Sequence, residues 1–481
     1  MKNERGITLV ALVIIIIILL ILSGVSIFPL LGNNGILIQV NRAKESTETS
    51  KLKEIISLVW TECETEYQLE NKENKTREEF FTEENLNSKI EEGSVSDFIY
   101  NEKEESFMLY HTDNGIKYNV KVANGNIDIN QDSSSIEDLK NWKNCIECSE
   151  QNPHIIKNKY EFESIKSHIN IDEDGKEIID GYFKLSENIY FYNSDFEKNG
   201  YFYNNGEGFI PIGLKEGPYE NLYENKAYNV KINFNGNNKE IVNVKINTKE
   251  LQRDYNSIFA RLDNGGQIKN LCINNLNISA PTSVGGIVRA LYEGAELKNI
   301  ILKNVNCRTT KNMGAMKSSG LVAGYIEGKL SNVKIYNSSF ISDSWYGGGI
   351  SGQISNRSDI NDVIMDKCNI KTYVEGGMLA GKIYEGTKIK NVNILNSSYT
   401  YTHNDAERSG LLFYSQSNEN KDNPAIFDNL NIKNVEYNEN LKKIVGKGYV
   451  KLINSNLKLK NYGNAKLTYE NVFLENSIID N

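Results

Sequence analysis

The feature that most constrains the fold is a short motif that returns throughout the C-terminal half of the chain. It reads Asn, aliphatic, any residue, hydrophobic, any residue, Asn, and its copies follow one another about every 30 residues. The clearest copies run from Asn270 to Asn275, Asn299 to Asn304, Asn332 to Asn337, Asn391 to Asn396 and Asn429 to Asn434. Weaker copies begin at Asn243, Asp362 and Asn471. A fixed period of this length predicts a fold of stacked, similar units.

Each copy predicts a β-strand, because hydrophobic and polar residues alternate with the period of a half-buried strand. A second recurring element, rich in glycine, falls between the copies at Gly286–Ala290, Gly320–Gly324, Gly349–Gly352, Gly377–Gly381 and Gly410–Tyr414. Two or three short strands per repeat predict a parallel β-solenoid. We expect the repeated Asn residues to form structural ladders at the coil corners, since Asn side chains hydrogen-bond to one another and tolerate left-handed backbone.

Several of these segments resemble the GLUG-repeat solenoids of bacterial surface proteins. The resemblance rests on Gly208–Gly213, Phe234–Asn238, Ile241–Val244, the copies of Gly320–Gly324, and an opening segment at Tyr182–Ile189. It implies a mainly β, right-handed parallel β-solenoid over residues 158–481. The copies after Gly410 lose the glycine pattern, so we expect irregular or capping coils at that end.

The N-terminus predicts a membrane span. No charged residue lies between Arg5 and Arg42, and the run from Ile7 to Leu31 is almost wholly apolar, which is long enough to cross a bilayer as one helix. Residues 2–9 and the isoleucine run after them resemble the processing site of type IV prepilins. That resemblance implies cleavage by prepilin peptidase between Gly6 and Ile7, followed by methylation of Ile7. The family's glutamate at mature position five is Ala11 here, which puts filament assembly in question.

The next segments predict a pilin-like stem and a small α+β head over residues 32–130, after the leader and span of 1–31. Helical spacing of apolar residues continues to Trp60, and alternating patterns at Phe107–Tyr110 and Ile116–Val122 predict a hairpin, with a third strand at Ile127–Ile129. A linker of residues 131–157 follows. It holds Cys145 and Cys148, for which a local disulfide, free thiols and a metal clip all remain open.

Composition removes some classes of function. The halves of the chain carry net charges of −15 and +6, yet the lysines of the basic half are spread along it, and no nucleic-acid-binding fingerprint appears. We therefore expect no nucleic-acid partner. No cofactor is predicted, and with four histidines and no second Cys-x-x-Cys pair a closed metal site is not expected. The alternating residues Asn170, Asp172, Asp174 and Gly175 resemble the start of a calcium loop, but Gly181 stands where a glutamate ligand is needed, so a solvated turn is expected.

Catalysis is also not expected, because no repeat column gathers Asp, Glu, His or Arg from successive coils. Glu293, Glu327 and Glu385 recur in equivalent turns and make an acidic row conceivable, although turn chemistry explains them more simply. Three further cysteines lie in different columns and are expected to be small core residues. One of them, Cys307, aligns with Ile278, Phe340 and Ile370.

Three hypotheses of function follow. In the first, a membrane-anchored, pilin-like protein with its bulk outside the cell displays a solenoid for adhesion or for binding an extracellular glycan or protein. In the second, the chain is a minor pilin or pseudopilin that primes or tips a filament or secretion system, with other pilin subunits as partners. The third, an enzyme acting on polysaccharides, lacks converging catalytic groups.

Overall fold

The computed structural model describes residues 54, 57–68, 95–101, 106–111, 117–123, 126–131, 149–198, 201–215, 227–249, 254–310, 317–343, 345–461 and 466–480. The chain divides into two compact units, Met1–Ser133 and Ser134–Asn481. The predictions for Gly6, Ile7, the span to Leu31, Cys145 and Cys148 lie outside the described residues. Among the helices that the structure does describe, none has the length and apolar character to cross a bilayer.

The first unit contains a short helix at 57–68 and an antiparallel sheet. Its strands follow chain order: β1 (Val95–Asn101), β2 (Ser106–His111), β3 (Lys117–Ala123) and β4 (Asn126–Gln131). The predicted hairpin is confirmed by the pairing of β2 with β3, and the third predicted strand by the pairing of β3 with β4. The first strand was not predicted, because its sequence lacks a clear alternation.

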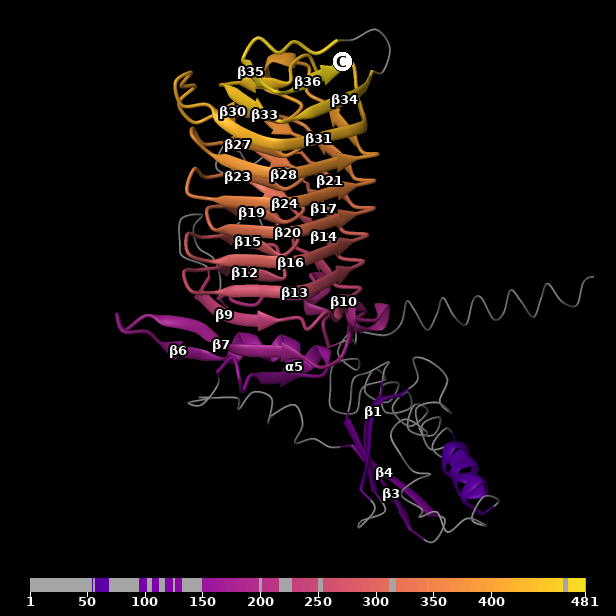
Figure 1. Cartoon of the computed structure of the whole chain (residues 1–481). Helices are drawn as coiled ribbons and strands as arrows, with labels where there is room; N and C mark the ends of the chain where they lie inside the picture. The colour runs from indigo at the N-terminus through magenta and orange to yellow at the C-terminus, as the bar shows by residue number, and fades with distance from the viewer. Residues whose placement is uncertain are drawn as a thin grey trace, which may run out of the picture. The chain divides into compact units, whose positions relative to one another are not determined.

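The second unit is a stack of short parallel strands, which we call the coil stack (Figure 1). Each coil contributes a long strand to the main sheet. These strands are β9 (Asn229–Asn235), β13 (Gln267–Asn274), β16 (Glu296–Lys303), β20 (Lys329–Tyr336), β24 (Asp359–Asp366), β28 (Lys388–Leu395), β31 (Ala425–Tyr437), β33 (Val450–Ile453) and β35 (Val472–Glu475). In the first of these coils, β10 (Glu240–Val242) continues the line of β9, because it pairs with the second half of β13. A corner residue then leads to a second strand of the same sheet. These second strands are β11 (Lys245–Asn247), β14 (Asn277–Ala280), β17 (Asn306–Thr309), β21 (Ser339–Ser342), β25 (Asn369–Thr372), β29 (Ser398–Tyr401), β34 (Asn456–Asn461) and β36 (Ile478–Asp480).

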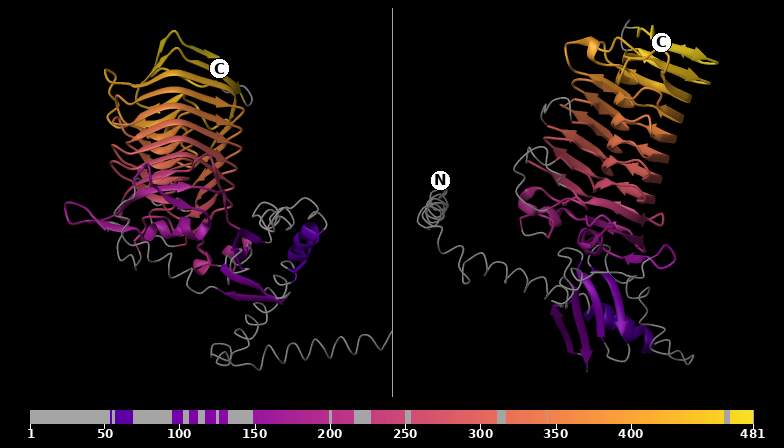
Figure 2. Two further views of the ribbon diagram at one scale, coloured as in Figure 1. Left: turned by 60° about the horizontal axis from the view of Figure 1, so that its bottom comes forward. Right: turned by 90° about the vertical axis from the view of Figure 1, so that its left-hand side faces the viewer.

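The glycine-rich elements build two further parallel sheets. A seven-stranded sheet contains β12 (Phe259–Leu262), β15 (Val288–Leu291), β19 (Ala323–Ile326), β23 (Ser351–Ile354), β27 (Ala380–Ile383), β30 (Phe413–Gln416) and β32 (Val445–Lys447). A three-stranded sheet contains β18 (Ser319–Gly320), β22 (Gly347–Gly348) and β26 (Gly376–Gly377). The mainly β prediction, with parallel strands in stacked sheets, is thus confirmed, and the two turned views show the strands stacked coil upon coil (Figure 2).

Register between coils places like residues side by side. Ile278, Cys307, Phe340 and Ile370 pair in sequence through β14, β17, β21 and β25, which confirms the predicted alignment of Cys307. All four are buried, and they belong to one continuous apolar core that fills the interior between the sheets. The alternation in the sequence therefore points every second residue inward along a whole column of coils.

The corners of the main sheet require left-handed backbone. Asn270, Asn299 and Asn332 have φ of 54°, 53° and 50°, and equivalent residues of neighbouring coils have similar values. Asn is the side chain that adopts this conformation at least cost apart from glycine. Asp362 and Lys367, which interrupt the motif, have φ of 59° and 55°, so the corner is kept even where Asn is not.

The N-terminal end of the coil stack is closed by irregular elements. These are β5 (His154–Ile156), α5 (Lys159–Ser164), β6 (Ile169–Ile171), β7 (Glu177–Leu185) and β8 (Ile189–Tyr190), with 3-10 turns at Ile165–Ser167, Asn193–Phe196 and Asn204–Gly206. Phe162 of α5 packs against Phe209, Phe234 and Phe259, with ring centroids 5.8, 5.8 and 5.9 Å apart. Helix α5 thereby covers the open end of the core, as terminal coils of a repeat protein require. Because β5 already pairs with β7, regular structure begins before the predicted boundary at residue 158.

Candidate functional site

The outward positions of the seven-stranded sheet carry large polar and aromatic side chains. Pairing between successive strands aligns one such column, which consists of Arg261, Ala290, Tyr325, Gln353, Lys382, Ser415 and Lys447. Its neighbours in each strand point into the core, as the buried Leu262, Leu291 and Ile326 show. The sheet therefore presents polar and aromatic side chains in a line parallel to the axis of the coil stack, interrupted at Ala290, which is small and buried.

One tyrosine, Tyr325, belongs to this column, and further tyrosines lie beside it. We call the set Tyr255, Tyr292, Tyr325, Tyr346, Tyr384 and Tyr414 the tyrosine strip. The rings of Tyr292 and Tyr325 lie 6.2 Å apart, centroid to centroid. Farther along, Tyr346 lies within electrostatic reach of Glu375, Tyr414 and Tyr384, so the strip continues across the later coils. Burial, and next the Glu375 carboxylate, raise the pKa of Tyr346 to about 12 and keep its hydroxyl protonated at neutral pH.

Cations lie over the tyrosine rings. The Arg261 guanidinium is 4.3 Å from the centroid of Tyr292, and the Lys382 ammonium is 5.1 Å from Tyr384 and 5.8 Å from Tyr346. The Lys447 ammonium lies 5.9 Å from Tyr414, at the C-terminal end of the strip. Each contact is within the range of cation–π attraction, which holds long side chains against the rings.

A column of glycines lets neighbouring chain segments reach the strip. A Cβ atom on Gly352 would lie 2.3 Å from the backbone nitrogen of Ser319 and 2.3 Å from the carbonyl oxygen of Tyr346. Gly324 and Gly381 are crowded in the same way by the backbone of adjacent segments. The second glycine of the repeated Gly-x-x-x-Gly element is therefore what allows the segment bearing Tyr346 to cross the sheet closely.

Most cations of this face are neutralised by carboxylates. Arg289 and Lys317 both pair with Asp254, at 3.1 and 2.9 Å, and Arg261 and Arg408 pair with Asp263 and Glu375. Burial alone would raise the pKa of Asp254, but the two cations outweigh it and lower the pKa below its ordinary value. Among the described residues, neither Lys382 nor Lys447 has a carboxylate within ion-pair distance. They remain the cations of the strip that a ligand can neutralise.

The glutamates of the equivalent turns do not form an acidic site. Arg357 occupies the same turn in the coil between them, and it pairs with Glu293 at 2.8 Å and with the buried Glu327. Glu385 instead accepts a hydrogen bond from the Asn418 amide at 2.8 Å. These turns therefore do not present paired free carboxylates for acid–base chemistry.

The predicted ladder asparagines lie on a different face, at the corners of the main sheet. At the first corner, side-chain hydrogen bonds run from Asn332 to Asn299 (2.9 Å), from Asn299 to Asn270 (2.8 Å) and from Asn429 to Asn391 (2.9 Å). At the second corner, Asn275 donates to Asn243, Asn304 to Asn274, Asn396 to Asp366 and Asn434 to Asn396. Asn337 shares the second corner's left-handed backbone, with φ of 48°.

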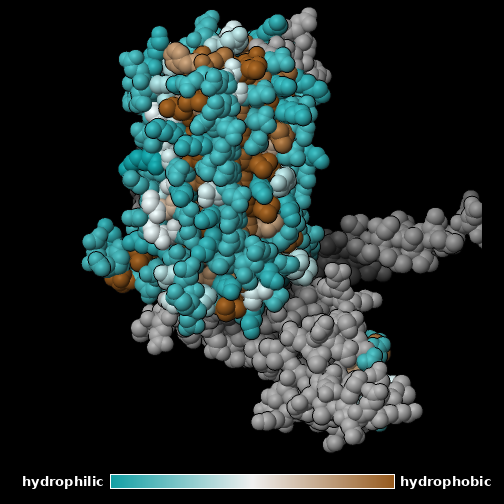
Figure 3. Space-filling view, viewed as in Figure 1, coloured by the Kyte–Doolittle hydropathy of each residue, from teal (hydrophilic) through white to brown (hydrophobic). Residues whose placement is uncertain are grey.

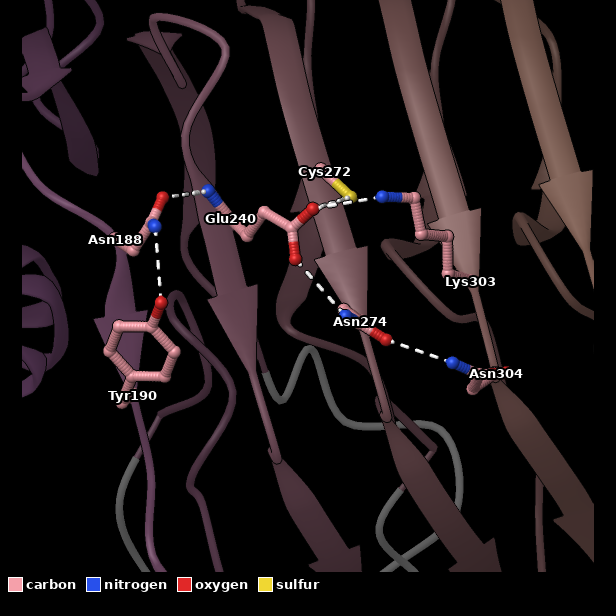
Figure 4. Close-up of polar contacts among 7 residues, drawn as sticks. All are labelled: Asn188, Tyr190, Glu240, Cys272, Asn274, Lys303 and Asn304. Carbon is pink, nitrogen blue, oxygen red and sulfur yellow. Dashed lines mark hydrogen bonds and ion pairs between the residues drawn. The ribbon is translucent and has the colours of Figure 1, made fainter. Parts of the chain in front are cut away.

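A cluster of polar contacts around Glu240 links neighbouring coils near the N-terminal end of the coil stack (Figure 4). Glu240 accepts hydrogen bonds from Lys303 at 2.9 Å, Asn274 at 3.0 Å and the thiol of Cys272 at 3.4 Å. Asn188 accepts from the Glu240 backbone N–H at 2.9 Å and donates to the Tyr190 hydroxyl at 3.1 Å. Because each of these polar side chains is hydrogen-bonded to another residue of the cluster, we infer that the cluster fixes the register between the first coils.

The remaining sequence candidates lie apart from the tyrosine strip. Cys307 and Cys368 are buried, and burial raises the pKa of both thiols, which makes them unreactive at neutral pH. Asp172 accepts backbone hydrogen bonds from Asp174 at 3.1 Å and Lys176 at 2.8 Å and so forms a turn. Within the described ranges, no group of three or more His, Cys, Asp or Glu side chains is arranged to hold a metal ion.

The strip was missed by sequence reasoning because its residues come from non-equivalent positions. Tyr325 lies within a strand, Tyr384 follows one, and Tyr346 precedes a short strand. Tyrosine recurrence close to the Gly-x-x-x-Gly elements is the one signal that could have indicated it. The face of the coil stack shown in Figure 3 is mostly hydrophilic. Hydrophobic residues on it follow one another along the axis of the coil stack.

No known protein family matches the sequence, and no curated protein matches it either.

Proposed function

We propose that this protein is a membrane-anchored bacterial surface protein whose β-solenoid binds an extended extracellular glycan along the tyrosine strip. The main support for this proposal is the alignment of tyrosines and cations along several coils of the seven-stranded sheet. The apolar faces of sugar rings stack on aromatic side chains, while hydroxyl groups and cations orient the sugar through hydrogen bonds. The apolar segment of residues 7–31 supports the membrane anchor, and the GLUG resemblance supports both surface display and a right-handed coil.

The geometry of the strip favours an extended ligand. The strip crosses many coils that are each separated by roughly 4.8 Å, the spacing of neighbouring strands in a sheet. Because aromatic and polar side chains follow one another from coil to coil, an extended polymer can contact several of them at once. The rings of the strip are half-buried, except that of Tyr414, which is buried, so they are held in fixed orientations and less conformational entropy is lost on binding.

A glycan array probed with the intact protein tests this function. Tyr325→Ala and Tyr384→Ala should each weaken binding to the glycans recognised by the native chain by about tenfold, as expected for a lost aromatic contact. Tyr336→Ala is the matched control, because Tyr336 is a half-buried tyrosine of β20 in the main sheet. Equal loss of binding in all three variants, or binding to no glycan, would refute the proposed site.

A second candidate function is a minor pilin or pseudopilin that primes or tips a filament. Gly6, Ile7 and the apolar run after them favour it, and Ala11 argues against a major subunit. Immunogold labelling distinguishes the two. Label at filament tips supports the pilin role, whereas label spread over the envelope supports the anchored surface protein.

A further inference from the structure

Two lysines of the strip occupy the same column two coils apart. Lys382 of β27 pairs in register with Ser415 of β30, and Ser415 pairs with Lys447 of β32. With roughly 4.8 Å between neighbouring parallel strands, the two lysines stand about 10 Å apart along the axis of the coil stack. The intervening residue is neutral, and so is Gln353 in the coil before. Within the last three strands of the sheet, positive charge therefore stands on alternate coils.

Both lysines are available to a ligand. Arg261, Arg289 and Arg408 of the same face are each engaged by a carboxylate, whereas no such partner lies within ion-pair distance of Lys382 or Lys447 in the described part of the chain. Each lysine instead rests against tyrosine rings of the strip. A ring holds the ammonium group in place without neutralising it, so the charge stays directed at whatever binds along the strip.

We propose that the ligand is an anionic polysaccharide with a disaccharide repeat, which carries one acidic group on every second sugar and lies along the axis of the coil stack. This inference rests on the proposed glycan function and specifies its ligand class. A sugar stacked on each coil would bring an acidic group to Lys382 and the next acidic group to Lys447. The sugar between them would face Ser415, whose hydroxyl can donate or accept a hydrogen bond.

The spacing favours a polysaccharide over an acidic peptide. In an extended peptide, side chains of one face recur about every 6.6 Å, so acidic groups fall at roughly 7 or 13 Å and do not match a spacing near 10 Å. A linear polysaccharide instead advances by about the length of one sugar ring per unit, which is comparable to the separation of coils. It also supplies apolar ring faces for the tyrosines, which a run of Asp or Glu does not.

The test uses the full chain in detergent micelles and isothermal titration with octasaccharides of hyaluronan and chondroitin, both of which carry one carboxylate per disaccharide. The same octasaccharides with reduced carboxyl groups serve as neutral probes. The double variant Lys382→Gln/Lys447→Gln should lose about five- to twentyfold in affinity for at least one acidic octasaccharide. Its binding should also depend less on salt than that of the native chain.

Matched controls keep the result specific. Lys371→Gln/Lys390→Gln removes the same charge from exposed lysines of β25 and β28 in the main sheet, and its affinity should stay within about twofold of native. The carboxyl-reduced octasaccharide should bind the native chain about as weakly as the acidic one binds the Lys382/Lys447 variant.

The outcomes separate the two proposals. If native protein binds acidic and neutral octasaccharides equally and the lysine variant changes neither affinity, the acidic specificity is wrong while glycan binding stands. If neither kind of octasaccharide binds and the glycan array is also blank, the proposed function fails together with the inference. Tighter binding of an octaglutamate peptide than of any octasaccharide would overturn the choice of polysaccharide.

Discussion

At the scale of single residues, the corner asparagines meet two demands at once. Their backbone lies in the left-handed region, and their amides link neighbouring coils through hydrogen bonds of 2.8 to 2.9 Å at Asn299. Glycine meets only the first demand, and alanine meets neither. The repeated Asn residues are therefore explained by the structure of the coil stack, and their recurrence does not indicate a ligand-binding site.

Substitutions at Asn299 separate the two demands. Asn299→Ala should lower the free energy of unfolding by about 2 to 3 kcal/mol, from the left-handed backbone and the lost hydrogen bonds together. Asn299→Gly should cost about 1 kcal/mol less, because glycine tolerates φ of 53°. Urea denaturation followed by circular dichroism measures both. Equal losses for the two variants would show that backbone conformation does not matter at this corner.

Asp254 predicts an acid-sensitive contribution to stability. Its side chain is 19% exposed, and Arg289 and Lys317 lower its pKa in the folded state despite the opposing effect of burial. A carboxylate with a lowered folded pKa stabilises the fold above its unfolded pKa of about 3.9, and this stabilisation is lost as the pH falls through the folded value.

Comparison with Asp254→Asn isolates this contribution. At pH 7 the variant should lose about 3 kcal/mol of unfolding free energy, since Arg289 and Lys317 are left without their carboxylate. The difference between native and variant proteins should shrink as the pH falls below about 4. Urea titrations from pH 7 to pH 3 provide the measurement, and a difference that stays constant over this range would contradict the assignment.

At the scale of elements, glycine in the seven-stranded sheet serves close approach of backbones. Gly352 of β23 has no room for a Cβ atom, because Ser319 and Tyr346 would lie 2.3 Å from it. The segment that carries Tyr346 could not lie in the strip without that glycine. The repeated glycines thus position the candidate site although they do not touch a ligand themselves.

Gly352→Ala should therefore destabilise the protein by about 2 to 3 kcal/mol through overpacking. Gly175→Ala is the control, since Gly175 has φ of 76° and a Cβ atom added there would meet no other atom within 4 Å, so that only backbone strain of about 1 kcal/mol is expected. Thermal unfolding measures both variants. A Gly352→Ala protein as stable as the control would mean that neighbouring segments shift apart easily.

At the scale of the whole molecule, the chain has two compact units, and the second, Ser134–Asn481, contains the coil stack. Residues 1–250 carry a net charge of −15 and residues 251–481 a net charge of +6. The proposed ligand-binding strip lies in this second, basic half. A glycan with acidic groups would be attracted to this half of the chain. The apolar residues 7–31 would then keep the strip at the cell surface.

Mass spectrometry of the native N-terminus tests how the molecule is anchored. On the prepilin resemblance, the mature chain should begin at methylated Ile7, because cleavage follows Gly6. A Gly6→Leu variant should keep the unprocessed leader and serves as the control. An intact Met1 in the native protein would instead mean that the N-terminus is a simple membrane anchor outside the pilin pathway.

The sequence by itself determined the repeat, the strands and the corners. These depend on neighbouring residues alone, since alternation fixes which side chains of a strand point inward and Asn marks the left-handed corners. The column of Ile278, Cys307, Phe340 and Ile370 could therefore be aligned correctly from the repeat pattern alone. The hairpin of the first unit followed from the same local alternation.

Only the tertiary structure decided where the candidate site lies. Tyr325, Tyr346 and Tyr384 come from a strand, a connecting segment and a turn, so no sequence period relates them. They converge because register between coils aligns the seven-stranded sheet and because Gly352 lets the neighbouring segment cross it. Contacts between residues tens of positions apart depend on how coils stack, and local pattern does not encode that geometry.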